Sequence, residues 1–182
     1  MTGKNATRLA WSQVGLTVAI LLAAIVFLVL SVDTPLPEET FGFRGLGLIL
    51  SAAFAAAGVL IATRVPSNPI GWILLAAALG TGLQELAAQY SNYGIYDSPG
   101  AVPRADVAAW IPEWVWIPYM AAIALFIPML YPDGQLPSPR CRPVLIVGSI
   151  GALLGTFAFA LVPGELPSSP GVRNPFGIEG AR

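Results

Sequence analysis

The sequence predicts an all-α integral membrane protein, a helical bundle with about five transmembrane helices. Long apolar runs alternate with short loops that are rich in proline and other turn residues. Hydrophobic residues make up 55% of the 182 residues and charged residues only 10%, whereas a soluble domain carries about 25% charged residues. A backbone inside lipid must satisfy its own hydrogen bonds, so we expect each apolar run to form a helix.

The first run is free of charged residues and is longer than the roughly 20 residues that cross a bilayer. Its length, and the lack of a convincing cleavage site after it, favour an uncleaved anchor over a signal peptide. In the loop before the third run, we expect Asn68 to cap a helix and Pro69 to take its first position. The predicted spans are residues 11–32, 46–63, 70–90, 112–131 and 144–162, and residues 1–162 form one bundle.

Short loops between the spans predict that consecutive helices pack as antiparallel neighbours. Lipid provides no hydrophobic drive for this packing, and small residues allow close approach of the backbones instead. The second span has Gly47, Ser51 and Ala55 at four-residue spacing, and the fifth has Gly151 and Gly155. These patterns favour helix contacts within the bundle more than dimerisation.

The orientation follows from the basic residues, which are enriched in cytoplasmic loops. On alternate sides of the predicted spans, one side carries five basic residues, most of them close to the helix ends. The other side carries four, Arg44, Arg104, Arg173 and Arg182, together with most of the acidic residues, so the bias is small in number. We therefore place the N-terminus in the cytoplasm and the tail after the fifth span outside, in the plasma membrane as a multi-pass protein. The topology determinants are Lys4, Arg8, Arg64, Arg140 and Arg142.

The third span carries the most informative polar residues. Thr81, Glu85 and Gln89 are spaced by four residues and share one helix face, and Gln84 lies beside them. A carboxyl group at mid-bilayer costs about 2.5–3.5 kcal/mol on the insertion scale, and less near an interface. One interpretation is a polar pocket that opens to the outside. The other is a snorkelling or protonated Glu85 that bonds to a neighbouring helix near the interface.

The entry to the fourth span contains Trp110, Glu113 and Trp114 around Pro112. Tryptophan is typical of the membrane interface, and a carboxylate suits the first turn of a helix, so structure alone explains these residues. The sharper hypothesis is that Trp110, Glu113 and Trp114 form walls of an outer pocket with Glu85. Tryptophan rings and carboxylates together suit a cationic amphiphile.

The composition excludes most enzyme chemistry. The chain has no histidine and one cysteine, Cys141, so the usual catalytic triads, zinc sites and haem ligation are absent. No phosphate-binding loop or dinucleotide motif is present. We expect no catalytic residue, cofactor or metal site and no enzyme activity. The net charge of −1, without a basic run, argues against nucleic acid as a partner.

The tail, residues 163–182, is rich in proline and glycine, and we expect it to be poorly ordered. It contains an echo of the start of the third span: Asn68-Pro69-Ile70-Gly71 recurs as Asn174-Pro175-Phe176-Gly177. The tail is therefore expected to be the lead-in to a sixth span that this sequence lacks.

Three segments resemble the N-terminal multi-span sensor region of actinobacterial-type sensor histidine kinases. They are residues 64–74, the proline-aspartate-glycine loop at 130–143, and 174–178, and the resemblance covers about 59–178. The loop departs from the family pattern at Tyr131, Gln135 and Cys141. The resembled family carries its phosphoacceptor histidine and ATP site in cytoplasmic domains, and this sequence has neither.

The resemblance implies a membrane-embedded sensor or input module of a two-component signalling histidine kinase, truncated before the catalytic domains. The implied partners are the lipid bilayer, a second copy as a homodimer, or a downstream kinase chain, with an unknown ligand. The alternative is a stand-alone accessory or transporter-like membrane protein that binds a small amphiphile. A purely structural bundle is the third interpretation.

Overall fold

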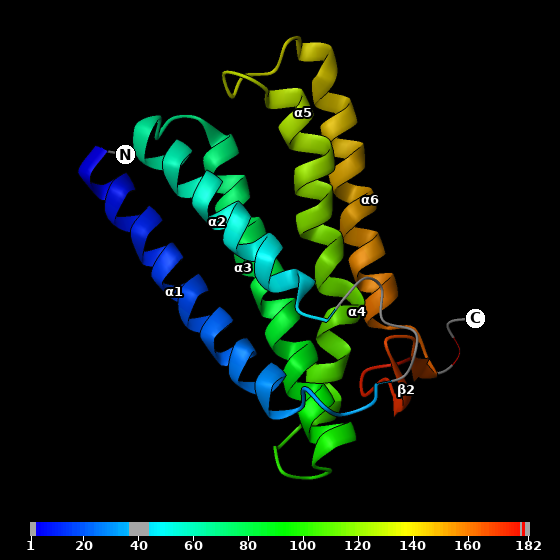
Figure 1. The fold of residues 1–182 in the computed structure, drawn as a ribbon. Helices are drawn as coiled ribbons and strands as arrows, with labels where there is room; N and C mark the ends of the chain where they lie inside the picture. Colours follow the sequence, from blue (N-terminus) through cyan, green and yellow to red (C-terminus); the bar gives the residue numbers. More distant parts are fainter. Residues whose placement is uncertain (1–2, 37–43, 179, 181–182) are drawn as a thin grey trace.

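The structure, a computed structural model, describes residues 3–36, 44–178 and 180. Within these residues, five helical segments are long and apolar enough to cross a membrane. They lie side by side as a bundle, with a small hairpin at one end (Figure 1). The predicted all-α membrane bundle is confirmed, and the bounds of the helices refine the predicted spans. The segments are Gly3–Leu30, Leu46–Arg64, Pro69–Asp97, Ala105–Leu130 and Pro139–Ala160.

The first three spans begin and end close to the predicted positions, apart from one extended end each on the first and third. Helix α1 (Gly3–Leu30) starts eight residues before the predicted span, and α2 (Leu46–Arg64) matches its span within one residue. Helix α3 (Pro69–Asn92) has the predicted N-cap, because the Asn68 side chain accepts a hydrogen bond from the Ile70 nitrogen at 2.9 Å. A π-helical turn, η1 (Tyr93–Asp97), prolongs α3 beyond the predicted end.

The fourth span differs most from the prediction. Helix α4 (Ala105–Ala121) begins seven residues before the expected start, and Asp106 occupies its first turn. A π-helical turn, η2 (Ala122–Phe126), and the short α5 (Ile127–Leu130) complete the span. Pro112 therefore lies inside the helix and does not start it. Proline is tolerated inside transmembrane helices, where neighbouring groups can satisfy the freed backbone groups.

The fifth span begins with a 3-10 turn, η3 (Pro139–Cys141), which leads into α6 (Arg142–Ala160). The tail then forms an antiparallel hairpin of β1 (Glu165–Leu166) and β2 (Ser169–Arg173). Leu166 is only 2% exposed and anchors the hairpin to the bundle. The prediction of a poorly ordered tail is wrong for residues 163–178. The high proline and glycine content allows the turns, and the contacts with the bundle stabilise them.

The two Asn-Pro segments have the same local geometry. Asn174 accepts a hydrogen bond from the Phe176 nitrogen at 2.9 Å, as Asn68 does from the Ile70 nitrogen. The Asn174 amide also donates to two carbonyls at the end of α6, at 2.8 and 3.0 Å. Unsatisfied carbonyls at a helix end need such partners. The role of this segment as the lead-in to a further span stays a prediction.

Helix α3 is the centre of the bundle and contacts α1, α2 and α4, whereas α6 packs on α4. The closest approach is between α2 and α3. A Cβ atom on Gly71 would lie 2.6 Å from the Ala62 nitrogen, and one on Gly58 would lie 2.9 Å from the Leu75 nitrogen. Ser51, on the predicted small-residue face, donates to the Ala78 carbonyl at 2.7 Å. Small residues thus bring the two backbones together, as expected in lipid.

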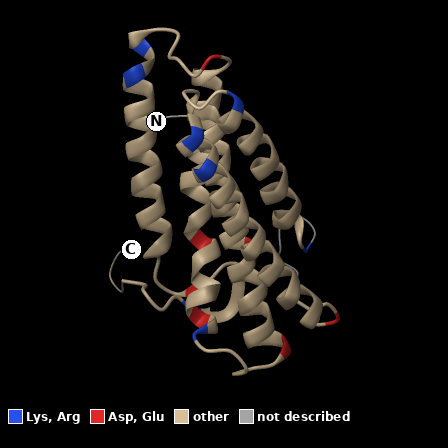
Figure 2. Cartoon of the chain, turned by 90° about the vertical axis from the view of Figure 1, so that its left-hand side faces the viewer, with Lys and Arg blue, Asp and Glu red and all other residues tan. Residues whose placement is uncertain are grey.

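Charge is distributed unequally between the two ends of the bundle. The start of α1, the turn between α2 and α3 and the turn before α6 lie at the same end, and they carry the five predicted topology determinants (Figure 2). Most acidic residues lie towards the opposite end (Figure 2). The alternation of the spans therefore gathers these five residues at one end as predicted, whereas Arg44, Arg104 and Arg173 lie towards the other end. The cytoplasmic placement of the first end stays a prediction.

Candidate functional site

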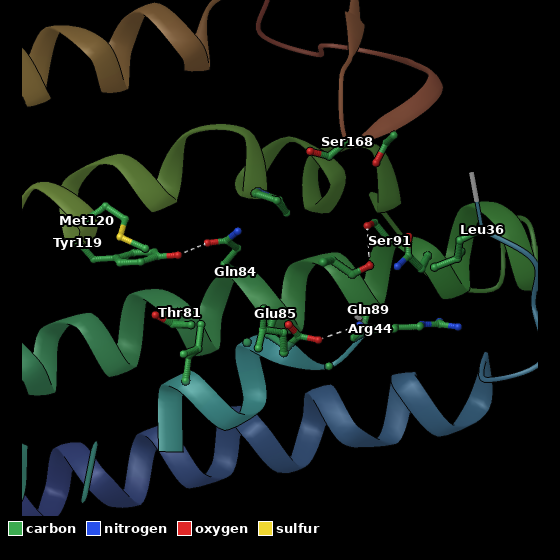
Figure 3. Close-up of a pocket in the computed structure, with 18 residues that line it drawn as sticks. Leu36, Arg44, Thr81, Gln84, Glu85, Gln89, Ser91, Tyr119, Met120 and Ser168 are labelled. Atoms are coloured by element: carbon green, nitrogen blue, oxygen red, sulfur yellow. Dashed lines mark hydrogen bonds between the residues drawn. The ribbon is translucent and has the colours of Figure 1, made fainter. Parts of the chain in front are cut away.

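A polar cavity of about 370 Å³ lies towards the end of the bundle opposite the five topology determinants. The start of α2, the second half of α3, the middle of α4 and the tip of the hairpin form its walls (Figure 3). Among its lining residues, those with polar side chains are Arg44, Thr81, Gln84, Glu85, Gln89, Ser91, Asn92, Tyr119, Ser168 and Ser169.

The structure brings together the four polar residues that the sequence places on one face of α3. Thr81 and Gln89 are buried, and Gln84 and Glu85 are half-buried, all at the cavity wall. Glu85 lies seven residues before Asn92, or about 10 Å along the helix. Because α3 continues through η1, this carboxylate is deeper in the span than the predicted helix end implies. Its interpretation as an interfacial carboxylate and its interpretation as a pocket residue both stay predictions.

Arg44, in the loop before α2, joins this polar face through Gln89. The Arg44 Nε donates to the Gln89 Oε1 at 3.1 Å, and the Gln89 Nε2 donates to the Glu85 Oε1 at 2.8 Å. The remaining nitrogens of Arg44 donate to the carbonyl and the hydroxyl of Ser31 at the end of α1. One amide side chain thus separates a guanidinium from a carboxylate and bonds to both.

Burial lowers the pKa of Arg44 from its ordinary value, and the negative charges of Glu85 and Asp97 raise it. An arginine side chain stays protonated under such opposing effects. The cavity therefore contains a fixed positive charge at Arg44. Three of its donor nitrogens are already occupied by Ser31 and Gln89.

Gly47 determines how closely the Glu85 carboxylate approaches α2. A Cβ atom at Gly47 would collide with the Glu85 Oε2 and would lie 3.2 Å from the Glu85 Cβ. Among the described residues, Gln89 is the single hydrogen-bond donor to this carboxylate. A carboxylate accepts about four hydrogen bonds, so Glu85 retains acceptor capacity towards the cavity.

The wall formed by α4 is fastened to the same face of α3. The Tyr119 hydroxyl donates to the Gln84 Oε1 at 2.6 Å (Figure 3). The ring of Tyr119 packs where Gly80 has no side chain, since a Cβ there would lie 2.8 Å from the ring. The position of α4 is therefore coupled to the polar residues of α3.

The structure separates Trp110, Glu113 and Trp114 from Glu85. Trp110 and Trp114 line a second cavity of about 300 Å³ between α4 and α6, together with Phe176 of the tail. The centroids of the Trp110 and Phe176 rings are 4.6 Å apart. The Trp110 Nε1 donates to the Ala160 carbonyl of α6 at 2.7 Å, so the structure does not bring these rings to the cavity that Glu85 lines.

Glu113 has a different environment from the one expected at a first helical turn. Its side chain is 7% exposed, and its Oε1 accepts a hydrogen bond from the Ser168 nitrogen at 2.9 Å. Ser168 is at the tip of the hairpin and lines the polar cavity. The Tyr96 hydroxyl also donates to the Pro170 carbonyl at 3.2 Å. Glu113 therefore fixes the hairpin over one side of the cavity and does not line the cavity itself.

The fold and the cavity define a class of protein, a multi-pass membrane protein with a polar cavity inside its helical bundle. Comparisons with protein-family models, with curated proteins and with solved structures found no match. The functional argument therefore rests on the geometry of the cavity.

Proposed function

We propose that the chain is a membrane-embedded sensor or input module and that the polar cavity is its ligand site. The observation that carries the proposal is the half-buried Glu85 carboxylate, which lines the cavity with one hydrogen-bond donor among the described residues. Charged groups inside membrane spans are costly, and they mark binding or transport sites by default. A ligand with a positive charge satisfies this carboxylate.

The location of the cavity suits the detection of a ligand. Its walls come from α2, α3, α4 and the tail hairpin, and α3 also contacts α1. A ligand that binds Glu85 on α3 therefore acts on several helix contacts at once. Shifts of about 1–2 Å between packed helices are a common switching movement. Such a shift reaches the basic end of the bundle through the same helices.

The output of the module is proposed from the resemblance to sensor histidine kinases. In that interpretation the module resides in the plasma membrane and its partner is a kinase domain, in a downstream chain or in a homodimeric assembly. The basic end then faces the cytoplasm, where the kinase acts, and the cavity faces the outside.

A second candidate is a stand-alone accessory or transporter-like protein that binds a small amphiphile. The irregular fourth span favours it, because Pro118, the π-turn at Ala122–Phe126 and Pro128 follow one another within it. π-Turns occur often at functional sites, and proline breaks support hinge movements. Uptake or release of a labelled amine by vesicles that contain the protein distinguishes this candidate from a sensor.

The test of the sensor proposal is a chimera that joins this chain, through one added transmembrane helix, to a histidine kinase domain. Reporter output is measured across a panel of membrane-active amines. Glu85→Gln keeps the size and a hydrogen-bonding group but removes the charge. The loss of a charge-assisted contact, about 1.5–3 kcal/mol, shifts the half-maximal dose roughly tenfold to a hundredfold.

Asp133→Asn is the matched control, because it removes a carboxylate in the exposed turn at the opposite end. We expect its dose dependence to equal that of the unmodified chimera. An unchanged response of the Glu85→Gln chimera to every amine contradicts a ligand site at Glu85.

A further inference from the structure

The polar cavity has a side that faces the lipid. Leu50 of α2 and Met120 of α4 both line the cavity, yet their exposed fractions are 36% and 43%. Helices α2 and α4 pack on α3 from either side and make almost no contact with each other. Among the described residues, we take the space between α2 and α4, with Leu50 and Met120 at its rim, as a lateral portal to the cavity.

Described residues cover other sides of the cavity. The hairpin tip, with Ser168 and Ser169, lies over one side and is held there by the buried Glu113. Arg44 lines the side near the end of α1, where its bonds to Ser31 fix it. Access from the membrane plane through the portal needs none of these contacts to break.

Polarity changes from the portal to the interior of the cavity. The lining residues Leu46, Leu50, Pro112 and Met120 present apolar surface on α2 and α4. Behind them, on α3, lies the Glu85 carboxylate with its remaining acceptor capacity. This order matches a molecule with a cationic head and an apolar tail.

The positive charge of Arg44 partly balances the charge of Glu85, but the Arg44 side chain is held in place. Its donors to Ser31 and Gln89 hold it against the protein, and Gln89 separates it from Glu85. The Glu85 carboxylate is therefore the charged group that the cavity offers to a molecule arriving from the portal.

We propose that the ligand is a bilayer-resident amphiphile with a primary ammonium group, which enters sideways between α2 and α4. Its ammonium group donates to Glu85, and its tail passes Leu50 and Met120 into the lipid. This inference rests on the proposed function, because it takes the polar cavity as the ligand site, and it adds the chemical class and the route. The trimethylammonium group of phosphatidylcholine has no N–H, so bulk lipid of that kind does not form the proposed hydrogen bond to Glu85.

The experiment uses the purified full chain in phosphatidylcholine nanodiscs. The probe is dodecylamine with a diazirine in its chain, and labelled residues are mapped by mass spectrometry. We expect saturable labelling of α2 and α4 around Leu50 and Met120, which unlabelled dodecylamine competes. In Glu85→Gln, the half-saturating concentration rises roughly tenfold to a hundredfold, because a charge-assisted contact is lost.

The portal itself is tested with Met120→Trp, which fills the place of the tail, and with Leu60→Trp as control. Leu60 is an exposed residue of α2, 52% accessible, that does not line the cavity. We expect Met120→Trp to reduce the saturable labelling severalfold and Leu60→Trp to leave it unchanged. Equal labelling in both variants overturns the lateral route.

Butylamine distinguishes failure of this inference from failure of the proposed function. Suppose that butylamine competes with the probe as well as dodecylamine does at equal aqueous concentration, and that Glu85→Gln weakens the binding of both amines. The cavity then binds cations from water. The lateral route and the amphiphile class are then wrong, and the proposed site stands. If Glu85→Gln changes the binding of neither amine, the proposed site is wrong as well.

Discussion

The contact between α2 and α3 provides the sharpest test of the packing. A Cβ atom added at Gly71 would lie 2.6 Å from the Ala62 nitrogen and 3.1 Å from the Gly58 carbonyl oxygen. Ordinary contacts need about 3.5 Å, so the helices must separate by about 1 Å at this point. The obstacle is backbone and cannot rotate away. We expect Gly71→Ala to destabilise the bundle by about 1–3 kcal/mol, the usual cost of overpacking.

Gly151→Ala is the matched control, because a Cβ at Gly151 in α6 has no atom within 4 Å. Alanine is a better helix former than glycine by up to about 1 kcal/mol, so this variant is neutral or slightly stabilised. Reversible unfolding in mixed micelles with increasing dodecyl sulfate measures both variants. If Gly71→Ala unfolds at the same detergent fraction as Gly151→Ala, the close approach of α2 and α3 is refuted.

Three further predictions address orientation, capping and the hairpin. An impermeant thiol reagent should leave Cys141 unlabelled in intact cells and label it after lysis; ready labelling before lysis reverses the proposed orientation. Asn68→Ala should lower stability by about 1–2 kcal/mol in the same micelle assay, because it removes the α3 cap and the hydrogen bond to the Pro132 carbonyl, whereas Asn68→Asp keeps the cap. Glu113→Leu should speed amide hydrogen exchange at Ser168, while Glu113→Gln, which keeps an acceptor oxygen, should change it less; equal exchange in both variants contradicts the role of Glu113 in holding the hairpin.

Local physics explains what could be predicted for the helices. Each run is long enough to satisfy its backbone bonds within lipid, so the spans follow from apolar length alone. The four-residue spacing of Thr81, Glu85 and Gln89 places them on one face whatever α3 packs against. The cap at Asn68 is equally local, since its partner nitrogen is two residues away.

The start of α4 shows where local signals mislead. Pro112 has the pattern of a first helical residue, and so Glu113 was expected in the first turn. In the structure the helix runs from Ala105 through Pro112, as transmembrane helices tolerate proline when neighbouring groups satisfy the freed backbone groups. Trp110 and Trp114 lie against α6, a contact between helices that local signals do not encode.

The sequence by itself determined the membrane bundle, the common face of the α3 polar residues and the placement of five of the basic residues at one end. Only the tertiary structure decided that Arg44 joins Glu85 through Gln89 and that Glu113 holds the hairpin. The Arg44–Gln89 and Glu113–Ser168 contacts join residues 45 and 55 positions apart, between segments whose relative placement depends on how the helices pack. The periodicity of the sequence does not predict these contacts, because residue spacing determines which side chains are neighbours within one helix and not which helices touch.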